Sequence, residues 1–141
     1  MTDPKAFPAA RDGLTWLAEG GTETEIMFRH GHELREFAMF ELLDRPQAVA
    51  DLRDMYRRYL DIAARHGFAA LVAGLDYRAS PDWGAKLGYS REGLAEMQHR
   101  CIDFLREVTA PYAGQLPALA ICGCVGPRGD AYARARDVTE E

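Results

Sequence analysis

The sequence predicts an α/β protein with about three parallel strands and intervening helices. Three continuous apolar runs, at residues 14–18, 69–75 and 118–122, have the length of buried strands. Two long segments with helical spacing of apolar residues separate these runs, so the predicted order is strand, helix, strand, helix, strand. Right-handed crossover connections through helices then make the three strands parallel.

Length and composition limit the classes of protein to consider. The 141 residues leave room for one domain, with 1–13 expected as a flexible lead-in and 14–141 as the folded part. The net charge of −5 argues against a nucleic-acid partner, which requires a clustered positive field. No run approaches the ~20 apolar residues that span a membrane, and the first residues lack the apolar core of a signal peptide. We therefore expect no membrane partner and a cytoplasmic location.

The first strand and the helix after it are short. The apolar run at 14–18 ends at Glu19-Gly20-Gly21, which indicates a buried strand that enters a tight turn. Residues 22–29 are predicted to form a short helix, with Thr22 as N-cap and Glu25 completing a capping box.

A long helix is predicted next, from Pro46 to Gly67, and a second strand follows it. Proline favours the first turn of a helix, and glycine favours the left-handed conformation at its end. The apolar stripe of this helix comprises Val49, Leu52, Met55, Tyr56, Tyr59, Ile62 and Ala63. The run at 69–75 shows no alternation, which is typical of a parallel strand covered on both faces.

A polar loop is expected from Asp76 to Tyr89, followed by a second long helix and the third strand. Ser90 is the predicted N-cap of this helix, and Pro111 with Gly114 ends it. Its predicted buried stripe comprises Leu94, Met97, Cys101, Leu105 and Val108.

Each predicted strand ends in a polar or glycine-rich cluster, at residues 19–23, 76–80 and 123–130. Ligands of parallel α/β folds bind at the carboxyl ends of strands, so one binding mouth is predicted there. Its candidate residues are Glu19, Glu23, Asp76, Arg78, Arg128 and Asp130. A carboxylate beside a glycine turn suits the cationic amine of a small substrate. The alternative is that these are ordinary polar turn residues.

The cysteines and histidines indicate no site by their spacing. Three cysteines without a signal peptide argue against a disulfide framework. Cys122 and Cys124 share a strand face, but no second Cys or His pair follows, so we interpret them as ordinary buried residues. His30 and His32 flank Gly31 and either point into a cleft or lie in a surface loop, the latter being our interpretation.

Three segments resemble the homocysteine S-methyltransferase family. Residues 17–25, Leu-Ala-Glu-Gly-Gly-Thr-Glu-Thr-Glu, resemble the first-strand motif Leu-x-Asp-Gly-Gly-x-Gly-Thr-Glu-Leu of that family. The Gly-Tyr-Ser step at 88–90 is similar too, and Gly-Cys-Val-Gly-Pro at 123–127 resembles the third-strand Gly-Ser-Val-Gly-Pro. The resemblance covers about residues 14–141.

The resemblance implies a (β/α)₈ TIM barrel that transfers a methyl group from a donor to the thiol of homocysteine, as in methionine biosynthesis. It also implies that Glu19 holds the substrate amino group and that Gly20 and Gly21 let the substrate approach the backbone. With Glu23 and Asp76 of the predicted mouth, the expected substrate-binding set is Glu19, Gly20, Gly21, Glu23 and Asp76. Two positions depart from the family motif: Glu19 stands for Asp, and Glu23 stands for Gly. In the family, three cysteine thiolates on later strands hold zinc, and none of the three cysteines here matches those positions. We therefore assign no metal ligand and no catalytic residue.

A complete barrel typically needs ~250 residues and eight strands. We therefore expect this chain to correspond to the N-terminal portion of a barrel truncated at its C-terminus, with methyltransferase activity only in the full-length form. Two alternatives stay open. One is a non-catalytic module that binds an amino acid, and the other is a partial barrel that self-associates through its open sheet edges.

Overall fold

The computed structural model describes residues 13–127 and 129–131, which form a three-stranded parallel sheet with helices. The strands are β1 (Trp16–Ala18), β2 (Ala69–Ala73) and β3 (Leu119–Cys122), in the order β1-β2-β3. The predicted α/β class and the parallel sheet are confirmed. Of the predicted lead-in, only Gly13 falls within the described residues.

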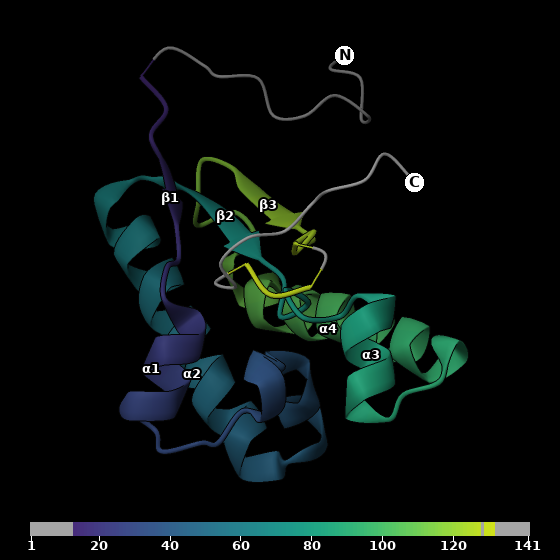
Figure 1. Ribbon diagram of the computed structural model, residues 1–141. Helices are drawn as coiled ribbons and strands as arrows, with labels where there is room; N and C mark the ends of the chain where they lie inside the picture. The colour runs from purple at the N-terminus through teal and green to yellow at the C-terminus, as the bar shows by residue number, and fades with distance from the viewer. Residues whose placement is uncertain (1–12, 128, 132–141) are drawn as a thin grey trace, which may run out of the picture.

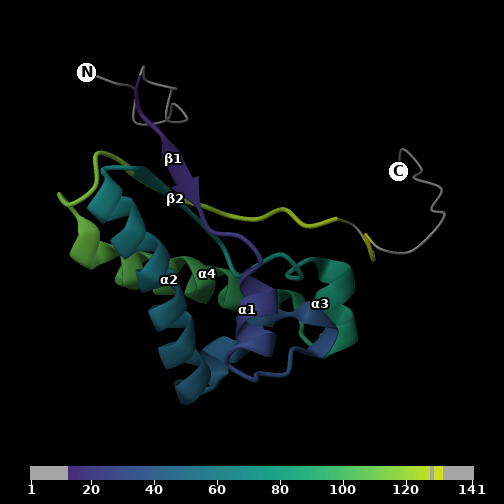
Figure 2. The same cartoon turned by 90° about the vertical axis from the view of Figure 1, so that its left-hand side faces the viewer.

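Helices fill both connections between the strands. The first contains α1 (Thr22–Phe28), the 3₁₀ helices η1 (Arg35–Phe37) and η2 (Met39–Asp44), and α2 (Pro46–His66). The second contains α3 (Pro81–Leu87), α4 (Arg91–Thr109) and the 3₁₀ helix η3 (Ala110–Tyr112). Two views at right angles show α2 and α4 on the same side of the sheet (Figure 1, Figure 2). Within the described residues, no helix has both the length and the apolar character needed to cross a membrane.

The core lies between the sheet and the two long helices. Ala70 pairs with Leu17 of β1 and with Leu119 of β3, and all three pack on the core. The predicted stripe of α4 is confirmed, because every one of its members is buried. In α2 the prediction is wrong at Ile62, which is 44% exposed, whereas Leu60 takes the buried place.

The helix ends follow the predicted signals with one exception. Gly67 ends α2 with a φ of 68°, and the Ser90 hydroxyl accepts a hydrogen bond from the Gly93 amide at 3.0 Å. The predicted capping box of α1 is wrong. Gly21 is the N-cap, with a φ of 61° that glycine adopts without strain, and the Thr22 hydroxyl donates to the Glu23 carboxylate at 3.2 Å.

The predicted loop between Asp76 and Tyr89 is also partly wrong, because it contains α3. Pro81 occupies the first turn of this helix, and Gly88 ends it with a φ of 87°. A Cβ on Gly84 would lie 2.7 Å from a methyl carbon of Leu94, so this glycine lets α3 pack closely against α4. The helix turns the side chain of Trp83 inward, toward the segment that follows β3.

Candidate functional site

A cavity of about 780 Å³ is lined by residues that follow all three strands, and we call it the strand-end cavity. Gly21 and Glu23 follow β1, Tyr77 and Arg78 follow β2, and Asp130 follows β3. The complete lining is Gly21, Glu23, Thr24, Glu36, Phe37, Tyr77, Arg78, Trp83 and Asp130. Four of the residues expected at the mouth or in the substrate-binding set are thus brought together, namely Gly21, Glu23, Arg78 and Asp130. Glu19, Gly20 and Asp76 are not in the lining, and Arg128 lies outside the described residues.

Glu19 connects the ends of β1 and β2. Its Oε1 accepts a hydrogen bond from the main-chain amide of Ala73, the last residue of β2, at 2.5 Å. Burial raises the pKa of Glu19, and hydrogen bonds from its own amide and from that of Ala73 oppose this shift. One carboxylate oxygen is therefore used to hold the sheet together.

Asp76 makes the equivalent connection between β2 and the segment after β3. Its two carboxylate oxygens lie 3.1 and 3.3 Å from the main-chain amide of Cys124, which donates to them. The side chain folds over Gly74, where a Cβ would lie 2.0 Å from Oδ1. Like Glu19, this carboxylate supplies an acceptor to a main-chain amide of the neighbouring strand or its continuation.

The three cysteines are not gathered into one group. Cys101 is buried, whereas Cys122 and Cys124 are half-buried rather than buried as predicted. Burial, followed by the charges of nearby carboxylates, raises the pKa of both Cys122 and Cys124, and burial raises that of Cys101 to about 12, which keeps these thiols protonated in the absence of a metal ion. Within the described ranges, no group of three or more His, Cys, Asp or Glu side chains is placed to hold a metal ion. The residues described here therefore do not fit the zinc that the resemblance implies.

Arg78 provides a buried positive charge in the lining of the strand-end cavity. Its guanidinium lies 4.0 Å from the ring centre of Trp83 and 5.2 Å from that of Tyr77. Nη1 donates to the carbonyl oxygen of Gly129 at 3.2 Å, and Nη2 lies 3.5 Å from a carboxylate oxygen of Asp130. Trp83 donates to the same Gly129 carbonyl at 2.9 Å, so α3 and the segment after β3 are fastened together.

One side of the cavity is a strained segment. Glu36 and Phe37, in η1, have φ angles of 50° and 61°, which are unfavourable for residues with a Cβ. The Phe37 side chain is nevertheless 50% exposed. An exposed aromatic ring on a strained backbone at a cavity edge is a feature that packing alone does not explain. No sequence signal predicts this conformation.

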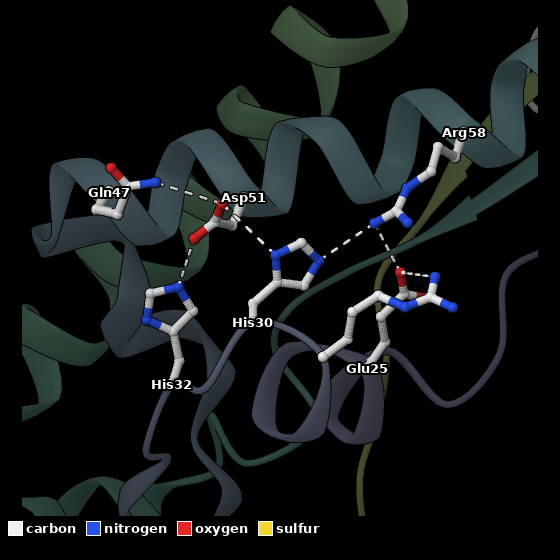
Figure 3. Close-up of polar contacts among 7 residues, drawn as sticks. Glu25, His30, His32, Gln47, Asp51 and Arg58 are labelled. Carbon is white, nitrogen blue, oxygen red and sulfur yellow. Dashed lines mark hydrogen bonds and ion pairs between the residues drawn. The ribbon is translucent and has the colours of Figure 1, made fainter.

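A second polar cluster, whose residues are not in the lining of the strand-end cavity, joins the segment after α1 to α2 (Figure 3). His32 Nε2 lies 2.7 Å from one carboxylate oxygen of Asp51, and His30 Nδ1 lies 3.5 Å from the other. Arg58 contacts His30 Nε2 at 3.2 Å and also pairs with Glu25 at 2.8 Å. The hydrogen bond from His32 is the main cause of the lowered pKa of Asp51.

The sequence analysis interpreted His30 and His32 as surface-loop residues and did not predict their contacts with Asp51 and Arg58. Asp51 and Arg58 are seven residues apart and share a face of α2, which is the spacing that could have indicated the cluster. Neither histidine lines the strand-end cavity.

None of the family models, curated proteins or solved structures compared with the chain matches it. The chemistry of the site therefore has to be inferred from its residues. The strand-end cavity combines aromatic rings, a buried guanidinium and carboxylates, a set that suits a small ligand carrying charges of both signs.

Proposed function

We propose that this chain provides the acceptor-binding part of a homocysteine S-methyltransferase-like TIM barrel. The supporting observation is that the ends of β1, β2 and β3 contribute to one cavity, and that Gly21 and Glu23 of its lining belong to the motif resembling that family. A complete barrel of this kind would transfer a methyl group from a donor to the thiol of homocysteine or a related compound.

We assign the substrate amino group to Glu23 rather than to Glu19. Glu23 lines the cavity, whereas an oxygen of Glu19 is occupied by the amide of Ala73 and Glu19 is not in the lining. An ammonium group bound to a carboxylate forms a charge-assisted hydrogen bond, which is about twice as strong as a neutral one. Glu19 then acts as a support for the sheet beneath the site.

The described residues support binding better than activation of a thiol. Glu23 and Arg78 line the strand-end cavity, whereas no group of three or more His, Cys, Asp or Glu side chains among the described residues is placed to hold a zinc ion. These observations favour the second candidate function, a module that binds an amino acid without catalysis. We expect no methyl transfer to homocysteine by this chain alone.

The test is calorimetric titration of the chain with L-homocysteine under reducing conditions. Glu23→Gln is expected to weaken binding by roughly tenfold to a hundredfold, the effect of losing a hydrogen bond to a charged group. Glu96→Gln, on the exposed face of α4, is the matched control and should leave the affinity unchanged. Equal affinities of the wild type and Glu23→Gln would contradict the assignment of the amine.

A parallel titration with a metal chelator separates the two candidate functions. Binding that survives the chelator supports the non-catalytic module. Metal-dependent binding together with methyl transfer would contradict it, and would show that this chain carries the chemistry itself.

A further inference from the structure

We propose that Arg78 binds the carboxylate group of the ligand in the strand-end cavity and so determines that the ligand is an acid. The proposal deepens the proposed function, but it concerns the opposite end of the ligand from the amine assigned to Glu23. It follows from the burial of Arg78, from its incomplete set of partners and from the charges around it.

Arg78 is buried with an incomplete set of hydrogen-bond partners. The residue is 4% exposed, and its Nε has no hydrogen-bond partner among the described residues. Its polar contacts are the neutral carbonyl of Gly129 at 3.2 Å and the carboxylate of Asp130 at 3.5 Å, the limit of a hydrogen bond. A guanidinium has five N–H groups, and leaving one of them unpaired in a buried place is unfavourable. An acceptor on a ligand in the strand-end cavity, which Arg78 lines, would add a partner to the guanidinium.

The charges near Trp83 favour an anion over a cation at this place. The ring of Trp83 already has the guanidinium of Arg78 at 4.0 Å and the ammonium of Lys86 at 4.3 Å from its centre. A cationic ligand group at Trp83 would meet two like charges, whereas a carboxylate would be attracted by both. The planar fork of an arginine also matches the two oxygens of a carboxylate better than a lysine does.

The same cavity contains carboxylates, which limits the ligand to one that also has a positive group. Glu23, Glu36 and Asp130 line it together with Arg78. A ligand with a negative charge alone would be attracted by Arg78 and repelled by these three carboxylates. A zwitterion, with its carboxylate at Arg78 and its ammonium at Glu23, satisfies both ends, so an α-amino acid is the ligand class that the charges favour.

The experiment compares four probes by calorimetry on the wild-type chain. L-methionine has both charges, L-methioninol has a hydroxymethyl group in place of the carboxylate, 3-(methylthio)propylamine lacks the carboxylate, and 4-(methylthio)butanoate lacks the ammonium. We expect methionine to bind roughly tenfold to a hundredfold more tightly than methioninol or the amine, the range for a hydrogen bond to a charged group.

Two variants then test whether Arg78 is responsible. Arg78→Met keeps most of the buried volume without the charge and should abolish the preference for methionine over methioninol. The control is Arg106→Met. Arg106 is exposed, pairs with Asp103 and lies in the last turn of α4, so this variant should keep the preference for methionine over methioninol. Should Arg78→Met fail to fold, equal binding of methionine and methioninol by the wild type would still overturn the proposal.

The outcomes separate this proposal from the proposed function. Amine-bearing probes that bind equally with and without a carboxylate overturn the role of Arg78 and leave the amine at Glu23 intact. Carboxylate probes that bind equally with and without an amine support Arg78 and overturn the amino-acid ligand. Absence of binding by all four probes overturns both.

Discussion

Replacing Glu19 by alanine is the sharpest test of how the strand ends are held together. The substitution removes the carboxylate oxygen that accepts from the amide of Ala73 at 2.5 Å. Ala73 is half-buried at the end of β2, so water replaces the lost acceptor only in part. The sheet would then contain an amide without a good partner next to the candidate site.

The expected cost follows from this geometry. A buried donor left without an acceptor costs about 1–3 kcal/mol, and partial access of water places Glu19→Ala in the lower half of that range, at about 1–2 kcal/mol. Glu19→Gln keeps an oxygen in the same place and loses only the charge. We therefore expect the glutamine variant to lose less than about 1 kcal/mol of unfolding free energy.

Urea unfolding followed by tryptophan fluorescence measures these differences, because Trp83 is buried and Trp16 lies in β1. Glu96→Ala on the exposed face of α4 is the control, with an expected change within about 0.5 kcal/mol. Alanine and glutamine variants of equal stability would refute the reasoning, since the hydrogen bond would then contribute nothing.

The pH dependence gives an independent check on the same residue. Burial raises the pKa of Glu19, so the folded state holds this proton more tightly than the unfolded chain does. Its contribution to stability is therefore greatest below the unfolded-state pKa and declines as pH rises through the folded-state pKa. Glutamine does not titrate, so the stability of the wild type relative to Glu19→Gln should fall as pH rises from about 4 through the raised folded-state pKa of Glu19. A constant difference would contradict the burial of this carboxyl.

Three further predictions concern other parts of the chain. Leu105→Ala should cost about 2–5 kcal/mol of unfolding free energy in urea titrations, because this side chain is fully buried in α4. Gly126→Ala should lower stability by about 1–3 kcal/mol in thermal unfolding, since its Cβ would lie 2.0 Å from the Tyr77 carbonyl oxygen. Gly20→Ala, with open space around it, is the control for that effect. Asp51 has a lowered pKa, so its stabilising contribution should be lost as pH falls below about 4, and acid unfolding of Asp51→Asn should lack this loss.

The long helices and the sheet could be predicted because their signals are local and repeated. The buried stripe of α4 extends over several turns, and the uninterrupted apolar run around β2 indicated a strand. The predicted cover on both faces of that strand is not found among the described residues, because α2 and α4 lie on one side of the sheet and Leu71 and Ala73 are only half-buried. Helix α3 was missed because seven residues are too few to show a stripe, although Pro81 and Gly88 mark its two ends.

The site could be predicted only at the level of topology. Parallel strands bring their carboxyl ends together, so the neighbourhood of Glu23, Arg78 and Asp130 followed from the order of the elements. The sequence does not show that Glu23 faces the cavity while Glu19 binds the sheet. Glu19 binds the sheet because the register of β1 and β2 brings the main-chain amide of Ala73 next to it, and the sequence pattern does not determine that register. The positive φ of Phe37 likewise depends on its surroundings and has no residue signature.

The main chain of Ala73 connects β2 to the end of β1 and to α2. Its amide donates to Glu19 beyond β1, and its carbonyl oxygen accepts from the Tyr56 hydroxyl of α2 at 3.1 Å. Both polar groups of the last residue of β2 are thus fixed by side chains from outside β2. A displacement of α2 along its axis would therefore strain the central strand at its carboxyl end. We therefore expect the strained segment at Glu36 and Phe37 to move when a ligand binds, while the carboxyl end of β2 stays in place.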